Sequence, residues 1–443
     1  MKSEAPLTEL GNMERFIGEH GENLLFCPQT GKWYVWNGHT WEIDSNGHVH
    51  YLAKSNARKL LDEARRINDD LKRNALLKWA ILSERKHIID NVVALSKTDP
   101  AIAISISRLD SNNFLLGTKN GIVDLNTQKI ITEKTKDCVT KICNVEYNSQ
   151  AICPRWDSFL EEITASNKKL TNFLQRMAGY CLSGSTEEQC LFIFHGGGAN
   201  GKSVFTNILK SLFNDYAVQT PPETLMVRNN QGASNDLARL RGARLVLATE
   251  SEENQTLAEA QIKQMTGGDV IVARHLYSEF FEFIPNFKII LTTNHRPKIT
   301  GTDHAIWRRI RLIPFTVTIP EEKRDPKLSS ILMGELPGIL NWALEGFKQW
   351  QEQGLNPPRC ILEATSGYRT EQDVLGEWLF ECTIQVSNKT ILTFQLYDSY
   401  VIYCDEAGLS QVSKNKFSRS LSERGYIKKK TSLGSAFTGI SFK

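Results

Sequence analysis

The chain has 443 residues, of which 41% are hydrophobic and 23% charged, and its formal net charge is +3. This balance excludes a collagen-like, low-complexity or mostly disordered chain. No apolar run approaches the ~18 residues of a membrane-spanning helix, and residues 1–16 lack the apolar core of a secretory signal. We therefore expect no membrane association, a cytoplasmic location and, at about 100–200 residues per domain, two to four domains.

Residues 1–150 are expected to form an N-terminal α+β domain. The aromatic stretch Gly31–Asp44 alternates around Asn37-Gly38, a dipeptide typical of hairpins because both turn residues must take positive φ. Asn120-Gly121 gives a second hairpin signal, and apolar residues recur at helical spacing over about residues 52–97. We expect the hairpin tryptophans to cover a small sheet rather than to stack on bases.

Residues 151–355 are expected to form the central domain, with a helical lead-in over 155–187. Strand-like apolar runs follow at Leu191–Phe194, Leu245–Ala248 and Lys288–Thr292. The stretches between them predict helices or hairpins. Because strands alternate with helices, the pattern favours a three-layer α/β core with a mostly parallel sheet.

Residues 360–443 are expected to form a third domain after a break at 354–358. Its helical patterns end in a β-ribbon, which suits a winged-helix-like module. From Ser410 to Lys443 there are eight lysines or arginines and one acid. Such a basic surface is a candidate face for DNA phosphates. Its expected DNA contacts are Lys428, Lys429 and Lys430, with Lys414, Lys416 and Arg419 on the preceding helix.

A glycine-rich loop provides the most informative motif. Residues 196–203 read GGGANGKS and fit GxxxxGK[ST] between an apolar strand and a helical pattern. Glycines let backbone N–H groups approach phosphates, and a helix N-terminus favours an anion. We expect Lys202 to reach the β- and γ-phosphates of ATP and Ser203 to bind Mg²⁺. The expected nucleotide-binding residues are Gly196, Gly197, Gly198, Ala199, Asn200, Gly201, Lys202, Ser203 and Val204.

Acidic and polar residues follow two further strands of the core. Glu250 ends the run from Arg244, and Glu252 and Glu253 come directly after it. Hydrolysis needs one acid near Mg²⁺ and another that activates water, so we assign Glu250 to the metal and name Glu252 as a candidate base. Asn294, at the end of the Lys288 run, is expected to place the attacking water.

A group of arginines follows at residues 308–311. An arginine that stabilises the transferring phosphoryl group contributes about 10³–10⁵ in rate and is often supplied by a neighbouring subunit. Arg308 and Arg309 are the candidates, and Arg311 lies beside them. Supply from a neighbour would require a ring with sites between subunits.

The order of these motifs resembles that of the superfamily-three helicases. The loop GGGANGKS, the strand end LVLATE, the stretch IKQMTGGD at 262–269, ILTTNHRP and WRRIRLIPF follow one another over about 120 residues. The set is most similar to the helicase part of phage and plasmid primase–helicases related to the poxvirus primase–helicase. The aromatic N-terminal region and the basic C-terminal module also resemble flanking domains of that family.

The resemblance implies a P-loop AAA+-like ATPase that forms a hexameric ring on single-stranded DNA. It also implies a channel hairpin, here Val270–Phe283, with Arg274, His275 and Tyr277 as candidates for gripping the strand. Lys263 is expected at the nucleotide interface or in the channel. Two departures stand out: Glu250 is followed by Ser251 where many relatives have a second acid, and the hairpin tip lacks the lysine that some relatives carry.

We therefore expect an ATP-dependent DNA helicase, in the bacterial host of a phage, plasmid or mobile element, that acts on single-stranded and forked DNA. No primase domain is found among residues 1–150, so we expect priming either by another chain, a separate primase or polymerase, or by a part that is not present here. Two alternatives stay open. One is a ring-shaped DNA motor without strand separation, and the other an origin-binding ATPase whose nucleotide only stabilises assembly.

Overall fold

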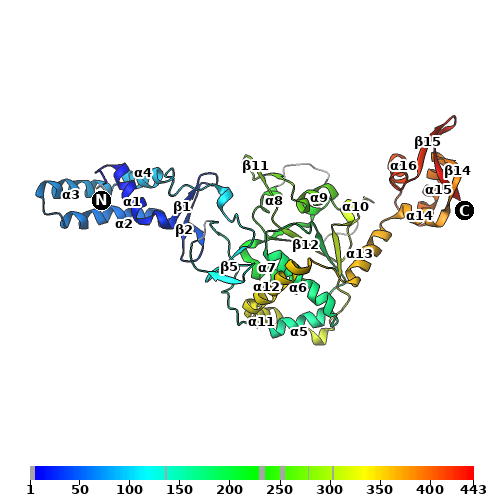
Figure 1. The fold of residues 1–443 in the computed structure, drawn as a ribbon, viewed down its shortest axis with the longest axis horizontal. Helices are drawn as coiled ribbons and strands as arrows, with labels where there is room; N and C mark the ends of the chain where they lie inside the picture. The colour runs from blue at the N-terminus through cyan, green and yellow to red at the C-terminus, as the bar shows by residue number, and fades with distance from the viewer. Residues whose placement is uncertain (1–4, 135–136, 229–234, 250–254, 278, 302–303) are drawn as a thin grey trace.

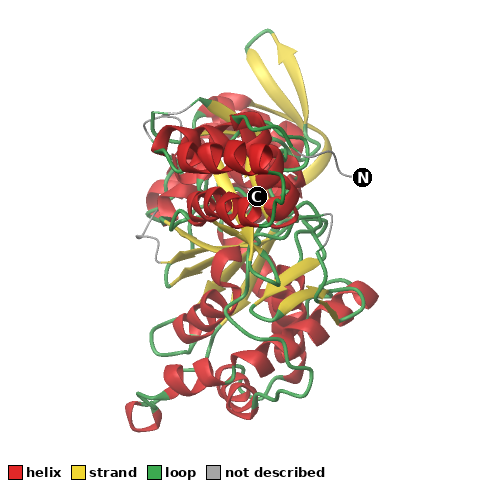
Figure 2. Cartoon of the chain, turned by 90° about the vertical axis from the view of Figure 1, so that its left-hand side faces the viewer, coloured by secondary structure: helices red, strands yellow, loops and turns green. Residues whose placement is uncertain are grey.

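The protein is described from a computed structural model of residues 1–443, which describes all residues except 1–4, 135–136, 229–234, 250–254, 278 and 302–303. The molecule is elongated (Figure 1). Helices of the N-terminal part lie at one end, the parallel-sheet core lies in the middle, and a small C-terminal module lies at the other end. Figure 2 shows the chain from the end that carries the N-terminal helices.

The N-terminal part contains one helical group and two small sheets. Helix α1 and strands β1–β3 precede α2, α3 and α4. Apolar residues of α1, β1, β2, α2 and α4 share one core, and α3 packs on the second half of α2 in a separate cluster. A second antiparallel sheet, β4-β5-β6, follows. The bounds are α1 Glu9–His20, β1 Leu24–Cys27, β2 Lys32–Trp36, β3 Trp41–Ile43, α2 His48–Arg65, α3 Asp70–Ser83, α4 Lys86–Ser96, β4 Leu115–Thr118, β5 Gly121–Asp124 and β6 Lys129–Ile131.

Both predicted hairpins form, but neither turn has the expected geometry. Between β2 and β3, Gly38 takes a positive φ of 102°. Asn37 does not, and its side chain instead accepts hydrogen bonds from the backbone N–H groups of His39 and Thr40, both at 2.8 Å. In the second hairpin Thr118 pairs with Gly121, so the turn residues are 119–120. An asparagine that caps its own turn replaces the predicted pair of positive φ angles.

The centre of the molecule is a five-stranded parallel sheet in the order β13-β7-β12-β9-β8. The three strands expected from apolar runs are confirmed as β7, β9 and β12, and the mostly parallel α/β core is confirmed with them. The bounds are β7 Leu191–His195, α7 Lys202–Phe213, β8 Ala217–Thr220, α8 Asn235–Ala238, β9 Leu245–Thr249, α9 Glu259–Gly267, β10 Ile271–Arg274, β11 Phe280–Phe283, β12 Lys288–Thr293, α10 His304–Trp307 and β13 Ile310–Pro314.

Both faces of this sheet are buried, which explains the uninterrupted apolar runs. Along β7, Phe192 and Phe194 face one cluster and Leu191 and Ile193 face the other. The first cluster includes apolar residues of α5, α6, α7 and α12, and the second includes those of α8, α9, α10 and α13. The bounds of the remaining core helices are α5 Pro154–Ile163, α6 Lys168–Leu182, α11 Leu328–Gly334, α12 Leu336–Gln353 and α13 Arg359–Glu371.

Two segments outside 151–355 also pack into the core. Leu116, Val123 and Cys143 share a cluster with α6 and α12, and the Tyr216 hydroxyl accepts a 3.0 Å hydrogen bond from the Gly117 N–H. At the other end, α13 packs on β13, and the ring of Tyr368 is fully buried in the second cluster. Residues 360–371, which we grouped with the C-terminal domain, therefore pack with the core.

The C-terminal module has its own core and an antiparallel sheet ordered β14-β16-β15. Its elements follow in the order helix, strand, helix, helix, strand, strand. Trp378, Tyr400 and Phe417 form its centre, with ring centroids 5.2–5.9 Å apart. The bounds are α14 Val374–Cys382, β14 Thr383–Leu392, α15 Thr393–Glu406, α16 Lys414–Glu423, β15 Ile427–Thr431 and β16 Gly434–Phe442.

Candidate active site

The glycine-rich loop connects β7 to the first turn of α7, as expected. Two of its glycines are required by the fold. A Cβ on Gly196 would lie 2.1 Å from the carbonyl oxygen of Phe315, and one on Gly201 would lie 2.3 Å from Ile163. Gly201 also has φ +83°, which favours glycine. A Cβ on Gly197 or Gly198 would meet nothing within 4 Å, so the middle of the loop borders open space.

Two side chains hold the loop in shape. The amide of Asn200 donates to the carbonyl oxygens of Gly197 at 2.6 Å and Phe315 at 3.3 Å. The Lys202 ammonium donates to the carbonyls of Gly196 at 2.6 Å and Gly197 at 2.9 Å. Lys202 is only 5% exposed, and burial lowers the pKa of its ammonium. The loop therefore concentrates a positive charge at the N-terminus of α7.

Lys202 also contacts the end of a neighbouring strand. Its Nζ lies 3.1 Å from Oδ1 of Asn294, which directly follows β12. The strands β7 and β12 pair in parallel, with His195 opposite Thr293, so the loop and Asn294 meet at the carboxyl edge of the sheet. The structure thus brings together Lys202 and Asn294, two residues that the sequence analysis selected from separate motifs.

The other residues expected at this edge lie in the glycine-rich loop, in the first turn of α7 and after β9. Ser203 is exposed in the first turn of α7, and Val204 packs beside the first core cluster. Ala199 has a positive φ of 55°. Strand β9 ends at Thr249, opposite Thr292 of β12. Glu250, Glu252 and Glu253 lie outside the described residues.

A cavity of about 380 Å³ adjoins Asn294 and contains residues that the sequence analysis gave no role. Arg296 pairs with Glu371, the last residue of α13, at 2.6 Å. Burial lowers the pKa of His195, and the charges of Arg296 and Lys202 lower it further. The signal for Arg296 was its place two residues after Asn294. The cavity is lined by His195, Asn294, His295, Arg296, Lys298, Glu371 and Gln372.

Arg308 and Arg309 are adjacent in sequence but occupy different environments. Arg309 is 8% exposed, and its guanidinium donates to Thr266 at 3.1 Å and to the Ala305 carbonyl at 2.6 Å. Arg308 is exposed, and its guanidinium donates to the side chain of Gln189 at 2.8 Å. Arg311 bonds the carbonyls of Arg308 and Ile310. Of the two candidates, only Arg308 presents its guanidinium at the surface.

These arginines lie at the edge of the sheet opposite the glycine-rich loop. Arg308 precedes β13, whose first residue, Ile310, pairs with Leu191 at the start of β7, whereas the loop begins after His195 at its end. A strand of 5 residues spans about 16 Å at roughly 3.3 Å per residue. This is more than an arginine side chain can bridge, so Arg308 cannot contact the loop of its own chain.

A hairpin is present at the expected residues, as the antiparallel pair β10–β11. The guanidinium of Arg274 lies 4.9 Å from the ring centre of Phe280, and the rings of His275 and Phe281 stack at 5.3 Å. Tyr277, at the tip, is fully exposed and has φ 61°. Lys263 lies apart from the tip, half-buried on α9. The hairpin therefore presents cationic and aromatic groups together.

The basic residues of the C-terminal module lie on two of its elements. Lys428, Lys429 and Lys430 are exposed on β15, and Lys428 also donates to Ser418 at 2.7 Å. Exposed basic residues of α16 are Lys414, Lys416 and Arg419.

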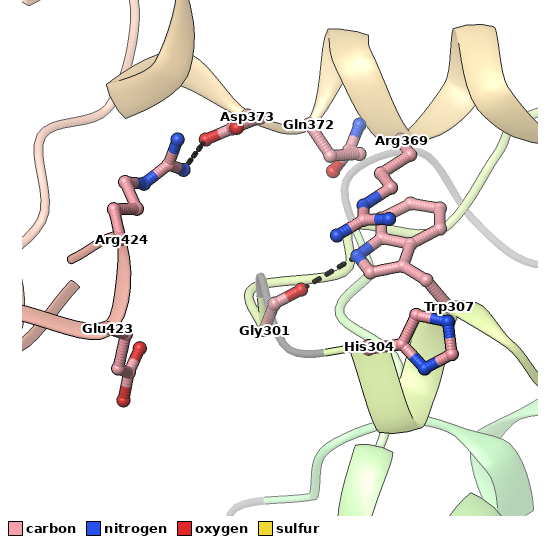
Figure 3. Close-up of a pocket in the computed structure, with 8 residues that line it drawn as sticks. All are labelled: Gly301, His304, Trp307, Arg369, Gln372, Asp373, Glu423 and Arg424. Carbon is pink, nitrogen blue, oxygen red and sulfur yellow. Dashed lines mark hydrogen bonds and ion pairs between the residues drawn. The ribbon is translucent and has the colours of Figure 1, made fainter. Parts of the chain in front are cut away.

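A second cavity, of about 480 Å³, lies where the module meets the core (Figure 3). On the core side the Trp307 indole donates to the Gly301 carbonyl at 2.9 Å, and the Arg369 side chain lies beside this ring. On the module side Arg424 pairs with Asp373, the N-cap of α14. Arg424 follows the last residue of α16, so this ion pair ties the end of α16 to the start of α14.

The fold and the loop geometry define a mixed α/β protein built on a five-stranded parallel sheet. Two family models match it. Residues 13–165 match the model described as D5 N terminal like. Residues 194–309 match a family of unknown function, DUF5906. The second match contains the glycine-rich loop, the hairpin and both candidate arginines.

Relatives among curated proteins point to the same family. The chain is 27% identical over 411 residues to "Putative helicase L207/L206" of Acanthamoeba polyphaga mimivirus, covering 84% of this chain and 43% of that protein. It is 26% identical over 221 residues to "Primase D5" of fowlpox virus, covering 46% of this chain and 27% of that protein. The D5 N terminal like match and these relatives support a likeness to the D5-type primase–helicases.

The relatives are longer than this chain and come from a different setting than we expected. The chain spans less than half the length of the curated relatives it matches. The relatives come from large viruses of eukaryotes, so they do not support the phage, plasmid or bacterial setting that we expected.

A solved structure has a related fold. The apo structure of the NrS-1 C terminal region has a TM-score of 0.50 with 11% identity, covering 96% of this chain and 97% of that one. At this identity the likeness shows the fold alone. Within the described residues, none of the helices has the length and apolar character required to cross a membrane.

Proposed function

We propose that the protein is an ATP-dependent DNA helicase that works as a ring, with six subunits as the expected number. The observation that carries the proposal is the 3.1 Å contact between Lys202 and Asn294 at the end of a glycine-rich loop that opens a helix. Backbone N–H groups, a helix N-terminus and a lysine together form the usual cradle for nucleotide phosphates. The names of the relatives, helicase and primase, support DNA as the polymer on which the energy is used.

The residues at the carboxyl edge fit a Mg²⁺–ATP complex. The exposed hydroxyl of Ser203, together with Glu250, would supply oxygen ligands, which Mg²⁺ prefers. When bound, the metal neutralises charge on the β- and γ-phosphates. Lys202 would exchange its loop carbonyls for phosphate oxygens, and Asn294 would orient the attacking water. Glu252 is the second choice for the base, and which acid serves as the base stays open.

The position of Arg308 supports an assembly with sites between subunits. Its guanidinium is exposed at the opposite edge of the sheet from its own glycine-rich loop. In a ring, this edge of one subunit can face the loop of the next, and an arginine delivered there stabilises charge on the transferring phosphoryl group. Arg309, buried against Thr266, would instead stabilise the fold of this edge.

Two surfaces would contact DNA. The β10–β11 hairpin, with Arg274, His275 and Tyr277, would grip one strand inside the ring, because aromatic rings stack on bases of any sequence. Lys263 would act at the nucleotide interface or in the channel. The C-terminal module would act as a winged helix, which its helix–strand–helix–helix–strand–strand order supports. Its lysines on β15 would bind phosphates of the fork. A relative is named a primase, which supports a primase or polymerase as the proposed working partner.

Replacing the central lysine tests the proposal. Lys202→Ala should lower ATP hydrolysis by about 10²–10³-fold or more, because a preorganised charge on the phosphates is lost. It should also abolish strand displacement on forked DNA. Lys210→Ala, on the same helix, is the matched control and should keep both activities, since Lys210 contacts only Gln219 among the interactions described.

The same assays separate the alternatives. ATP hydrolysis that survives Lys202→Ala would refute the site. ATP-driven movement on DNA without strand separation would favour a ring-shaped motor. Nucleotide-dependent assembly with no DNA-stimulated turnover would favour an origin-binding ATPase.

A further inference from the structure

The cavity beyond Asn294 lies next to the expected position of the last phosphate of ATP. The side chain of Asn294 contacts Lys202 and also lines the cavity. The cavity has a volume of about 380 Å³, which leaves room for a phosphoryl group and water. A nucleoside triphosphate that follows the loop to Lys202 would therefore end at this cavity, whereas a diphosphate would stop short of it.

The charges around the cavity favour an anion. Arg296 and Lys298 line it together with His195, and Glu371 is the single carboxylate among its lining residues. Arg296 and Lys202 both lower the pKa of His195, so both charges act on one imidazole. Arg296 and Lys202 thus converge on His195, and among the described residues only Arg296 of these two has a carboxylate partner.

The backbone that carries Arg296 is held firmly by helix α13. The Tyr368 hydroxyl donates to the carbonyl of Pro297, and the backbone N–H of Ile299 donates to the side chain of Gln372 at 3.2 Å. The Arg296 guanidinium lies 5.4 Å from the Tyr368 ring centre. The loop is thus fixed directly after Arg296, and the guanidinium can change its partner without moving the backbone.

The ion pair with Glu371 is suited to exchange. The two side chains are 31% and 54% exposed. A pair of this kind contributes little to stability because water screens it. A phosphate carries more charge than a carboxylate and offers several acceptor oxygens, and arginine binds both groups through the same planar set of donors.

We propose that Arg296 binds the terminal phosphate of the nucleotide in its own subunit and leaves Glu371 to do so. The inference rests on the proposed function and adds a residue that distinguishes ATP from ADP within one chain. It differs from the role of Arg308, which would come from the neighbouring subunit. Glu371 acts as a competing partner that holds Arg296 when no triphosphate is bound.

Equilibrium binding of fluorescent ATP and ADP analogues to the full chain tests this role. Arg296→Ala should weaken ATP-analogue binding by roughly ten- to hundredfold, because a charged hydrogen bond is lost, and should leave the ADP analogue within about twofold. Glu371→Gln breaks the same ion pair but keeps the arginine. It should strengthen ATP-analogue binding by up to about fivefold, since the competitor is removed. Arg296→Lys should restore part of the preference.

The opposite signs expected for the two variants distinguish phosphate binding from a structural role. If the ion pair only supports the fold, both variants should change binding of both nucleotides alike and lower the melting temperature alike. That result, or an unchanged ATP-to-ADP preference in a folded Arg296→Ala protein, would overturn the inference alone. A wild-type chain that binds neither nucleotide would overturn the proposed function and this inference with it.

Discussion

Two buried lysines lie at opposite edges of the same sheet and have different neighbours. Lys202, at the carboxyl edge, is 5% exposed and bonds carbonyls of a loop that borders open space. Lys288, the first residue of β12 at the amino edge, is 2% exposed and bonds the carbonyls of Ser183 and Ser185. Its ammonium also lies 4.8 Å from the centre of the Tyr180 ring.

The difference between the edges is whether the partners can be exchanged. Around Lys288 the partners belong to packed main chain, and Arg244 nearby bonds the carbonyls of Leu182 and Leu115 in the same way. These cations join the lead-in helices and the β4–β6 sheet to the core. Around Lys202 the partners are a glycine loop and Asn294, next to a cavity. A buried cation therefore indicates a binding site only where its surroundings leave room for a ligand.

The largest effect is expected at the arginines of the amino edge, where Arg308 is exposed and free to meet a neighbouring subunit and Arg309 is buried. Arg308→Ala should lower ATP turnover by about 10³-fold or more, because the transition state loses a charge supplied from the next subunit. Mixing Arg308→Ala and Lys202→Ala proteins should recover part of the activity, since some interfaces then combine an intact loop with an intact arginine. Steady-state ATP hydrolysis of the mixture measures this recovery.

Arg309→Ala is the matched comparison for the neighbouring position. It should lower the free energy of unfolding by roughly 1–3 kcal/mol, because the buried hydroxyl of Thr266 and the Ala305 carbonyl lose their donor. A stable Arg309→Ala protein with an Arg308-like loss of turnover would reverse the assignment of the two arginines. A mixture without recovery would contradict supply from a neighbouring subunit.

Exposed lysines form a third environment, with a smaller expected effect. Lys429 and Lys430 lie exposed on β15, so each can release one counterion on binding a DNA phosphate. Changing both to glutamine should weaken DNA binding. It should also reduce the magnitude of the slope of log affinity against log salt concentration by about 1.4–1.8. Fluorescence anisotropy at several salt concentrations measures the slope. Changing Lys168 and Lys169, which are exposed on α6, to glutamine should leave this slope unchanged. An equal change of the slope in that control variant would contradict a specific role for β15.

The strands of the core could be predicted because their physical cause is local. The middle of a parallel strand buried on both faces must be apolar, and Leu191–Phe194 of β7 and Ile289–Leu291 of β12 are. The loop and Asn294 could be selected for a similar reason, since each lies directly after such a strand. Parallel pairing then brings the strand ends together at one edge.

The remaining features depend on contacts between distant residues. Lys288 opens an apolar run, and only the folding of residues 180–185 over it shows that it is buried. Arg296 follows Asn294 in the sequence, but its partner Glu371 lies on a helix that we had grouped with another domain. The choice between Arg308 and Arg309 likewise depends on Thr266.

The amino-edge lysine gives the smallest expected effect, seen in stability and its dependence on pH. Burial lowers the pKa of Lys288 from 10.5 to about 7. Between these values the unfolded chain holds the proton and the folded protein does not, so the contribution of Lys288 to stability rises with pH, by at most about 1.4 kcal/mol per pH unit. Below about pH 7 both states hold the proton and the contribution is constant. Denaturant unfolding of wild-type and Lys288→Met proteins at pH 6 to 9 measures this, because other titrating groups cancel in the difference. Lys210→Met is the control, because Lys210 is only partly buried. A difference between wild type and Lys288→Met that stays constant over this range would show that Lys288 titrates normally and that the two edges hold their lysines alike.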